Sequence, residues 1–243
     1  MINELITVVS VTFNNRDGLI RTLDSLTRVA TKPKAVVVID GGSTDGTEAV
    51  VDRYRQDLAI RFVSDRDDGI YDAMNKSRIY VTTELVHYLN GGDELWGDPY
   101  RGVVNACRFP VEVHDPILSV TWRDYVKLAG FGYCHQGLVF RAGHTPYDVR
   151  YEIAADFDLI ASEFPDGVGA IPLVRNGLVR YYLGGVSTIK RGLGRSEIFA
   201  VAWRRFGIFV FIRLALELFV KELIPLQMRR RWASFLFGAP SRR

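Results

Sequence analysis

Three acidic clusters follow apolar stretches of this chain, and carboxylates in such places can bind a metal ion and a nucleotide. The clusters are IDGGSTDGT at Ile39–Thr47, DRDDGIYDAMN at Asp65–Asn75 and LNGGDE at Leu89–Glu94. Carboxylates that follow buried strands gather at one edge of a sheet, where an α/β fold builds its ligand site. Such an edge can hold a divalent cation and a diphosphate together.

Strands that alternate with helices are expected to position these clusters. Apolar, β-branched runs predict strands at Leu5–Phe13, Ala35–Asp40, Ile60–Ser64 and Leu85–Leu89. Apolar spacing and capping residues predict helices at Arg16–Arg28, from Ser43 or Asp45 to about Asp57, and at Tyr71–Tyr80. Pro33 is expected to break the chain before the second strand. The alternation predicts an α/β fold with a mostly parallel central sheet, right-handed crossovers and flanking helices.

The middle of the chain has a less regular pattern. Two short strands are expected around His114–Pro116, and another at Phe131–Phe140. Tyr151–Phe164 predicts a helix that carries Asp156 in or near its first turn. On such a helix Asp158 points about 200° away from Asp156, so it is expected to be a surface or supporting residue.

Composition and charge limit the function classes. The 243 residues, 48% of them hydrophobic, suit one large domain or one domain with an appendage. Residues 190–243 hold 12 Lys and Arg against 3 Asp and Glu, whereas residues 1–189 hold 19 against 25. An acidic body argues against a nucleic-acid partner, because binding a phosphate backbone needs a basic groove. Two cysteines, Cys107 and Cys134, indicate a reducing cytosol and are expected to pack as small apolar residues. No basic stretch precedes the first apolar run, so a cleaved signal peptide is not expected.

Seven segments together resemble the family 2 glycosyltransferases of the GT-A fold, particularly the branch that builds bacterial envelope polysaccharides and glycolipids. They are TVVSVTFNN, VVIDGGSTDGT, DDGIYDAMNKS, HYLNGGDEL, CHQGLVF, YEIAADFDL and GGVST, in the family's order. Each segment alone is weak, but the ordered set over roughly residues 5–189 is specific. The resemblance implies a Rossmann-like GT-A domain at residues 1–189, followed by a basic, amphipathic helical tail at residues 190–243.

The resemblance also implies which residues bind the nucleotide-sugar donor. They are Thr12, Phe13, Asn14, Asp40, Asp68, Tyr71, Asn90, Gly91, His135 and Gln136. Simpler structural roles stay open for several of them. The role of Asp40 can be limited to a turn with Gly41, and His135 can be a hydrogen-bonded core residue.

The segment LNGGDE corresponds to the family's Asp-x-Asp type motif after the fourth strand. Asn90 stands where an Asp is frequent and Gly92 replaces another, which leaves Asp93 as the metal ligand. One carboxylate suffices for Mn²⁺ or Mg²⁺ when donor phosphates and water supply the other oxygens. The alternative is an Asn-Gly-Gly turn with a capping Asp.

Asp156 matches the family's catalytic base, which would take the proton of an acceptor hydroxyl. A single base opposite the leaving group implies direct displacement with inversion. The loop Gly184–Thr188, followed by Lys190 and Arg191, either closes over the diphosphate or is an ordinary linker. We therefore predict a metal-dependent inverting glycosyltransferase. Its donor would be a GDP- or UDP-sugar, and its acceptor a lipid-linked saccharide or another glycolipid.

The basic tail suggests a membrane surface. Phe206–Ile224 is rich in apolar residues but carries a narrow stripe of Arg213, Glu217 and Lys221, and these charges argue against a transmembrane span. The following QMRRRWASFLFG combines arginines with aromatic residues, which favours an interfacial anchor on an anionic leaflet. The alternative is packing on the catalytic domain or in a homodimer. A cytoplasmic protein, peripheral on the inner face of the membrane, is expected.

Two other functions are compatible with parts of the sequence. The altered Asp-x-Asp motif suggests a catalytically inactive glycosyltransferase-like subunit that binds a membrane partner. A nucleotidyltransferase shares the α/β architecture, but it usually opens with a Gly-rich, basic phosphate loop after its first strand. This chain has TFNNRDG at that place, which argues against it.

Overall fold

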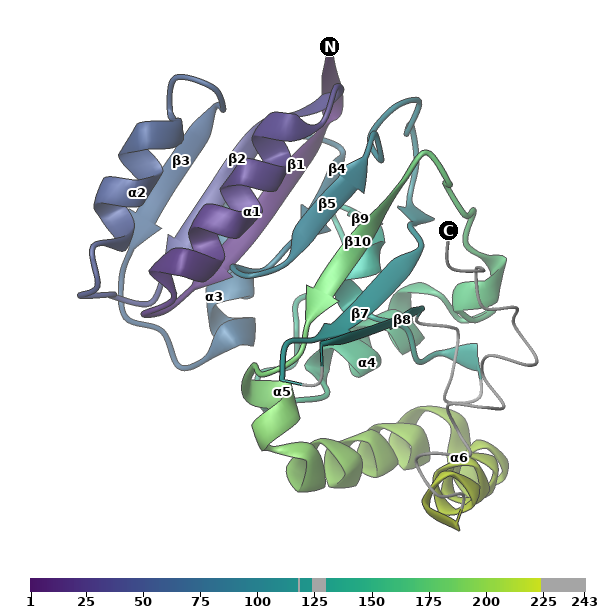
Figure 1. Cartoon of the computed structure of the whole chain (residues 1–243). Helices are drawn as coiled ribbons and strands as arrows, with labels where there is room; N and C mark the ends of the chain where they lie inside the picture. Colours follow the sequence, from purple (N-terminus) through teal and green to yellow (C-terminus); the bar gives the residue numbers. More distant parts are fainter. Residues whose placement is uncertain (118, 124–129, 224–243) are drawn as a thin grey trace. The chain divides into compact units, whose positions relative to one another are not determined.

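The fold is described from a computed structural model of the chain, in which residues 1–117, 119–123 and 130–223 are described. The chain divides into a first unit, Met1–Ile198, and a second unit that begins at Phe199. The first unit holds two sheets and their helices (Figure 1). The strands are β1 Ile2–Thr12, β2 Lys32–Asp40, β3 Ile60–Ser64, β4 Leu85–Tyr88, β5 Glu94–Gly97, β6 Cys107–Arg108, β7 Val111–Asp115, β8 Val120–Arg123, β9 Leu138–Arg141 and β10 Gly177–Tyr182. The helices are α1 Arg16–Arg28, α2 Thr47–Tyr54, α3 Ile70–Ser77, α4 Ala155–Glu163, α5 Val186–Ile189 and α6 Arg191–Leu223, which extends into the second unit.

The larger sheet has the strand order β3-β2-β1-β4-β9-β6. Strand β1 pairs in parallel with β2 and with β4, and β2 pairs in parallel with β3, whereas β9 runs antiparallel to β4 and β6. The chain adds β2 and β3 on one side of β1 and then returns to add β4 on the other side. The carboxyl ends of β1 and β4 therefore form a topological switch point, the place where open α/β sheets bind ligands.

Alternate residues of β1 build the two apolar layers on the faces of this sheet. Ile6 and Val8 pack in one layer with α1 and α2, and Val9 and Val11 pack in the other with α3 and α4. A strand that is covered on both faces must be apolar at nearly every position, which explains the continuous β-branched run of β1. The mostly parallel, helix-flanked sheet that the sequence predicts is confirmed.

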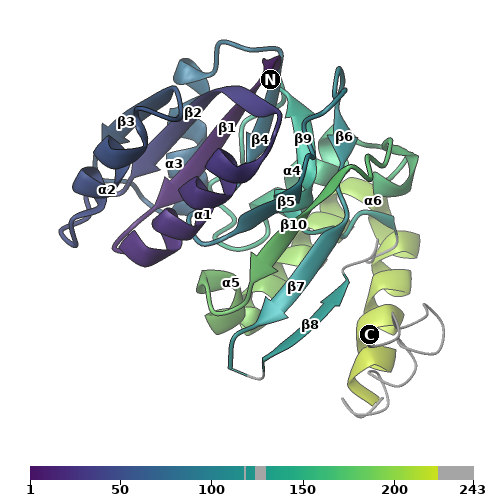
Figure 2. The same cartoon turned by 45° about the horizontal axis from the view of Figure 1, so that its top comes forward.

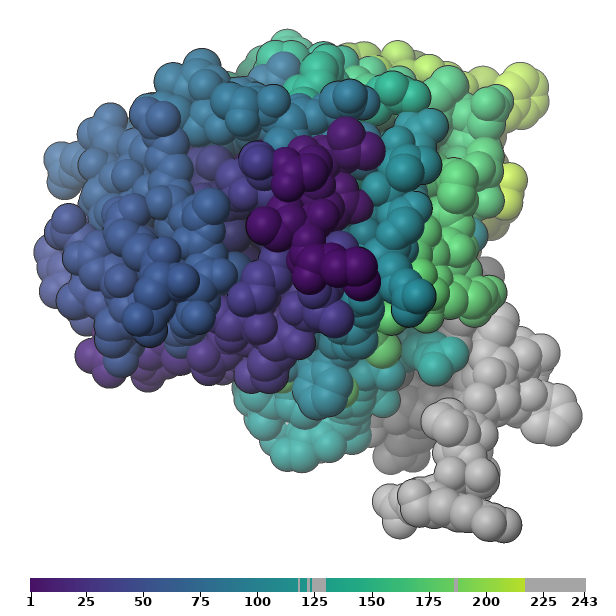
Figure 3. Space-filling view, turned by 90° about the horizontal axis from the view of Figure 1, so that it is seen from above, coloured from purple at the N-terminus to yellow at the C-terminus, as the bar shows by residue number. Residues whose placement is uncertain are grey.

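A second, smaller sheet follows in the order β5-β10-β7-β8. Its strand β10 runs antiparallel to β5 and parallel to β7, so it brings a late segment of the chain against the residues that follow β4 (Figure 2). Seen from above, the purple and blue N-terminal part and the teal and green later strands form a continuous surface within the first unit (Figure 3).

Several predicted boundaries were wrong. Pro33 lies inside β2, opposite Asn3, because it sits ahead of an irregularity in the β1–β2 register where a missing N–H is tolerated. Only the end of the predicted strand Phe131–Phe140 is extended, since His135–Gly137 form a 3-10 turn. The predicted helix at Tyr151 begins instead at Ala155.

The second unit is described as far as Leu223. Helix α6 has a kink at Gly207, where φ is 72° and ψ is −166°. Beyond this kink Phe211 contacts the rings of Phe199 and Trp203, at centroid distances of 5.4 and 5.7 Å. Among the residues that the structure describes, no helix has both the length and the apolar character to cross a membrane. The predicted anchor QMRRRWASFLFG lies outside the described residues.

Candidate active site

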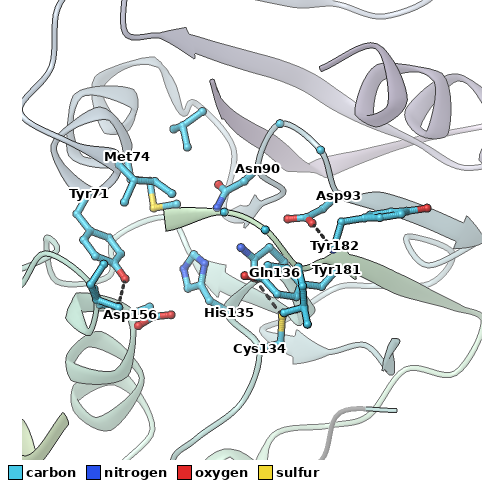
Figure 4. A pocket seen from close by; sticks show the side chains of 18 of the residues that line it. Tyr71, Met74, Asn90, Asp93, Cys134, His135, Gln136, Asp156, Tyr181 and Tyr182 are labelled. Atoms are coloured by element: carbon cyan, nitrogen blue, oxygen red, sulfur yellow. Dashed lines mark hydrogen bonds between the residues drawn. The ribbon is translucent and has the colours of Figure 1, made fainter. Parts of the chain in front are cut away.

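A cleft with a volume of about 1250 Å³ opens at the switch point, and all of its lining residues belong to the first unit. Tyr71 and Asp156 lie at one end, Asp93 and Tyr182 lie at the other, and His135 is between them (Figure 4). Ordinary ligand pockets have volumes of roughly 300–1,000 Å³, so this cleft has room for two substrates. Of the residues that the sequence assigns to the site, all except Asp40 and Asp68 line it.

The end of β1 forms one wall of the cleft. The Oγ1 of Thr12 is buried and has no hydrogen-bond partner in the described protein. Asn14 has a φ of 45°, a left-handed conformation that Asn tolerates, and its N–H donates to Ser43 Oγ at 2.7 Å. Between them, the Phe13 side chain is 62% exposed and lines the cleft. This wall therefore offers an exposed aromatic ring to a ligand, with the unpartnered Thr12 hydroxyl buried behind it.

The turn Asn90–Asp93 forms the floor, and helix α1 holds it. Thr22 Oγ1 accepts from the N–H of Gly92 at 2.8 Å, and it lies 2.8 Å from the carbonyl oxygen of Asp93. A Cβ on Gly91 would lie 3.2 Å from both Thr12 Oγ1 and the Val11 carbonyl oxygen, so the turn approaches β1 more closely than most side chains allow. The turn is thus fixed before any ligand binds.

Asp93 is almost completely buried at the end of this turn. Burial raises the pKa of its carboxyl to about 7, against the opposing effects of the Tyr182 N–H and the Arg21 charge. The Tyr182 N–H donates to Asp93 Oδ1 at 3.1 Å, and the Arg21 guanidinium lies 4.4 Å from the centre of the Tyr182 ring. A cation beside Asp93 would favour its ionised form.

The oxygen atoms of Asn90 and Asp93 supply part of what a hard divalent cation needs as ligands. Asn90 Oδ1 is buried without a hydrogen-bond partner, and the Asp93 carboxylate is close by along the turn. Amide and carboxylate oxygens are ligands that Mg²⁺ and Mn²⁺ accept. Within the described part of the chain, no three His, Cys, Asp or Glu side chains gather into a metal-binding group. A bound ion would therefore need phosphate and water oxygens as well.

Asp156 lies in the first turn of α4 and faces the other end of the cleft. Burial raises the pKa of its carboxyl to about 6, opposed by hydrogen bonds from the Phe157 N–H and from Tyr71 and reinforced by the negative charge of Glu197. A carboxylate with a pKa near 6 is ionised at neutral pH and still accepts a proton readily. The neighbouring Asp158 is buried rather than on the surface, so of the two roles considered for it only the supporting one is compatible.

His135 and Gln136 line the cleft from a buried 3-10 turn. The Nε2 of His135 lies 2.5 Å from the Tyr147 hydroxyl, and burial lowers the pKa of this imidazole to about 3. His135 is therefore neutral at physiological pH and brings no positive charge to a phosphate. The backbone carbonyl of Gln136 is bound by His87 Nε2 at 2.6 Å, which fixes the turn from beneath.

Two acidic residues in the predicted donor site do not reach the cleft. Asp40 is buried, and its carboxylate accepts hydrogen bonds from the N–H and hydroxyl of Ser43 and from the Ser64 hydroxyl. Asp68 is exposed, and the neighbouring Asp67 lines the cleft in its place. The Gly69 N–H donates to Asp67 Oδ1 at 3.0 Å, and Gly69 also lines the cleft.

Sequence reasoning missed two residues that complete the site, Arg21 and Tyr182. Arg21 lies on a helix that the sequence predicts. Gly18 and Arg21 are three residues apart, so they lie on the same side of this helix, and both line the cleft. Tyr182 ends β10, which was not predicted. The run GLVRYY, flanked by Asn176 and Gly184, has the composition of a strand, and this composition is the signal from which β10 could be predicted.

Residues 7–96 match the family model described as Glycosyl transferase family 2. A PGL/p-HBAD biosynthesis glycosyltransferase of Mycobacterium tuberculosis is 27% identical over 175 residues, which cover 63% of this chain and 67% of that protein. The matched residues include the β1 wall and the Asn90–Asp93 turn, whereas Asp156 lies beyond the family match.

Solved structures show the same fold. A mannosyltransferase of Pyrobaculum calidifontis, solved with GDP-Man and Mn²⁺, has a TM-score of 0.60 at 18% identity over 82% of this chain and 64% of that one. S. aureus TarS has a TM-score of 0.57 at 13% identity over 83% of this chain, which spans 40% of TarS. A TarS fragment, residues 1–349, was solved with UDP and has a TM-score of 0.58 at 13% identity, over 93% of this chain and 77% of the fragment. The match over residues 7–96 and the named relatives make the chain similar to glycosyltransferases of family 2, and the solved structures share its GT-A fold.

Proposed function

We propose that this protein transfers a sugar from a nucleotide-diphosphate sugar to an acceptor hydroxyl, with inversion at the anomeric carbon. The observation that carries the proposal is the joint presence of Asp93 and Asp156 in one cleft at the switch point of the sheet. One carboxylate lies beside polar groups suited to a diphosphate, and the other is buried with a pKa near 6. Sugar transfer needs both a stabilised leaving group and a base for the acceptor.

The donor nucleotide would bind along the wall formed by Thr12, Phe13 and Asn14. The exposed Phe13 ring offers an apolar surface to a base. Arg21 would lie beside the diphosphate, because it lines the cleft next to the Asn90–Asp93 turn. GDP-Man and UDP are bound by structural neighbours of this chain, and a GDP- or UDP-sugar is accordingly the proposed donor.

A divalent cation, Mn²⁺ or Mg²⁺, would be held by Asp93 with the amide oxygen of Asn90. When bound, such an ion neutralises negative charge on a leaving diphosphate. The proposal is supported by the unpartnered Asn90 oxygen, the lone N–H donor on Asp93, and the Mn²⁺ in the structure of the mannosyltransferase neighbour.

Asp156 would act as the general base. Its carboxylate is ionised at neutral pH, and the hydrogen bond from the Phe157 N–H to Oδ1, 2.7 Å long, fixes its orientation. It would take the proton from the acceptor hydroxyl as the new glycosidic bond forms. The diphosphate would then leave from the opposite side of the sugar, and this direct displacement inverts the anomeric carbon.

The acceptor is proposed to be a lipid-linked saccharide or a glycolipid, reached from the cytoplasmic face of the membrane. A related glycosyltransferase carries PGL/p-HBAD biosynthesis in its name. The second unit exposes large apolar side chains, including Trp203 and Phe209, the latter 85% exposed. Together with the basic composition of residues 190–243, these side chains suit an anionic membrane surface. A homodimer contact is the competing use of the same residues.

The test of donor and metal is a thermal-shift panel with UDP, GDP, dTDP and CMP, each with and without Mn²⁺. A ligand at 100 times its dissociation constant stabilises a protein by about 2.7 kcal/mol, which is readily detected. We expect one nucleotide to raise the Tm of the wild type with Mn²⁺, and this response to disappear in Asp93→Ala. The exposed variant Asp17→Asn serves as the control and should respond like the wild type.

Transfer itself is tested by measuring UDP or GDP release from UDP-glucose, UDP-GlcNAc and GDP-mannose, with octyl glycosides as acceptor probes. The wild type should release nucleotide in an acceptor-dependent manner, and Asp156→Asn should not. A folded protein that binds no nucleotide and releases none would refute the enzyme proposal in favour of the inactive subunit.

A further inference from the structure

The segment that leads into α4 is held from outside the helix. The first backbone N–H groups of a helix have no partners within it, and Ala154, at the N-cap position, supplies no side-chain hydrogen bond. Glu197, more than forty residues along the chain, binds the amides of the segment ahead of the helix, including the N-cap N–H of Ala154. Its Oε1 accepts from the Glu152 N–H at 2.9 Å, and its Oε2 accepts from the N–H groups of Ile153 and Ala154 at 2.8 and 2.9 Å.

We propose that Glu197 is a positioning residue for Asp156: its carboxylate fixes the segment Glu152–Ala154 and thereby holds the base at the cleft. The inference rests on the proposed function, because it assigns Asp156 the role of base. It adds a residue outside both the family match and the residues that sequence reasoning selected.

Three positions, one just before α6 and two in its first turns, contact the same segment. Lys190 forms an ion pair with Glu152, and Glu197 binds the three amides. Between them, a Cβ on Gly194 would lie 2.8 Å from Ile153 Cγ2, so α6 comes within a distance that leaves no room for a side chain. The spacing of 190, 194 and 197 places these positions on one face of a helix. The contact is therefore a built interface rather than one isolated hydrogen bond.

Ile153 is fixed from two directions. Glu197 binds its N–H, and the Tyr71 hydroxyl of α3 donates to its carbonyl oxygen at 2.7 Å. Asp156 follows three residues later, on the first turn that this peptide leads into. A change of this peptide's position would move the start of α4 and Asp156 with it. Misplacement by about 1 Å can cost a reaction roughly a hundredfold.

The charge of Glu197 provides a second, independent signal. The ionisable groups that interact with Asp156 are Tyr71 of α3, Tyr147 of the preceding loop and Glu197 of α6. Of these, Glu197 is the negative charge, and it raises the pKa of Asp156. Neutralising Glu197 must therefore shift the titration of Asp156 to lower pH, whereas a change that only loosens the fold has no reason to do so.

The experiment compares Glu197→Ala and Glu197→Gln with the wild type in the full chain. Ser196→Ala is the control on the same helix, because its hydroxyl bonds only the Leu193 carbonyl oxygen, and Glu48→Gln is the control for an exposed glutamate. Nucleotide release is measured from the donor that the wild type uses, at pH 5 to 9. Hydrogen exchange is measured at the amides of residues 152–154.

Glu197→Ala should lower kcat at least tenfold at the pH optimum, with the donor KM changed less than twofold and faster exchange at residues 152–154. Glu197→Gln should keep part of the activity and move the acidic midpoint of the pH profile to lower pH. Both controls should match the wild type in all three measurements.

Protected amides in Glu197→Ala, or an unchanged kcat and acidic midpoint in both variants, would overturn the inference. If Glu197→Ala does not fold, the isosteric Glu197→Gln decides through its pH profile and its exchange. A wild type that releases no nucleotide from any donor would instead refute the proposed function, and the exchange measurement would still decide whether Glu197 holds the segment.

Discussion

Replacing Asp156 by Asn should remove activity and at the same time stabilise the folded protein at alkaline pH. Burial raises the pKa of this carboxyl from 3.8 to about 6. Its protonated form is therefore favoured by folding, so the stability that it contributes is fully present below pH 4 and is lost as pH rises through 6. Two pKa units at 1.36 kcal/mol each correspond to about 3 kcal/mol.

Asn has the shape of the neutral acid and keeps an oxygen for the Phe157 N–H. At pH 8, Asp156→Asn should therefore unfold at a higher urea concentration than the wild type, and its free energy of unfolding should be larger by up to about 3 kcal/mol. At pH 4 the two proteins should unfold at the same urea concentration. At about 2–4 °C per kcal/mol for a chain of this size, its Tm at pH 8 should rise by several degrees. Transfer should fall by roughly 10²–10⁴-fold, the usual contribution of a general base.

Urea unfolding at pH 4, 6 and 8, followed by circular dichroism, measures this difference. The exposed Asp17→Asn on α1 is the matched control and should stay within about 0.5 kcal/mol of the wild type at each pH. The reasoning would be refuted by an Asp156→Asn chain that is no more stable than the wild type at pH 8, or by a stability difference that does not change with pH.

Three further results are expected. Arg21→Gln should raise the donor KM about fivefold to tenfold in steady-state kinetics. Arg21→Lys should lie between it and the wild type, because lysine keeps the charge but loses the planar contact with Tyr182. Unchanged KM values would show that Arg21 does not bind the donor. Gly137→Ala should lower the free energy of unfolding, measured in urea, by about 1–3 kcal/mol, because its Cβ would lie 2.4 Å from Val111 Cγ2. In the control Gly143→Ala the Cβ meets no atom within 4 Å, so the free energy of unfolding should hardly change. The kcat/KM of the wild type should fall on the acidic side with a midpoint near pH 6 as Asp156 becomes protonated; a flat profile between pH 5 and 7 would exclude this carboxylate as the base.

The elements of the larger sheet could be predicted because their signals are local. β1 is rich in β-branched residues over its buried part, Ile6–Thr12, which is covered on both faces, and α1 repeats leucines at helical spacing. The second sheet was harder to predict, because β5 and β8 are short and β10 pairs with strands that are distant in sequence. Pairing between such segments depends on the rest of the fold and leaves little periodicity in any one of them.

The predicted site shows the same division. Strand ends placed Thr12, Asn90 and Asp93 at the cleft, because the carboxyl ends of parallel strands meet at one edge. The sequence pattern does not distinguish the adjacent acids Asp67 and Asp68, of which Asp67 lines the cleft. Glu197 could not be predicted, because a side chain that binds the backbone of a distant segment leaves no spacing signal near that segment.

The late arrival of β10 and α6 has a consequence for the newly made protein. The family-matched residues 7–96 contain Asp93, yet the N–H that binds it belongs to Tyr182, and the carboxylate ahead of α4 belongs to Glu197. Chains fold from the N-terminus as they leave the ribosome. A nascent chain can therefore form the wall of the cleft at the end of β1 before it can form the rest of the site. Only a chain extended past residue 197 has both the N–H that binds Asp93 and the carboxylate that binds the segment ahead of α4.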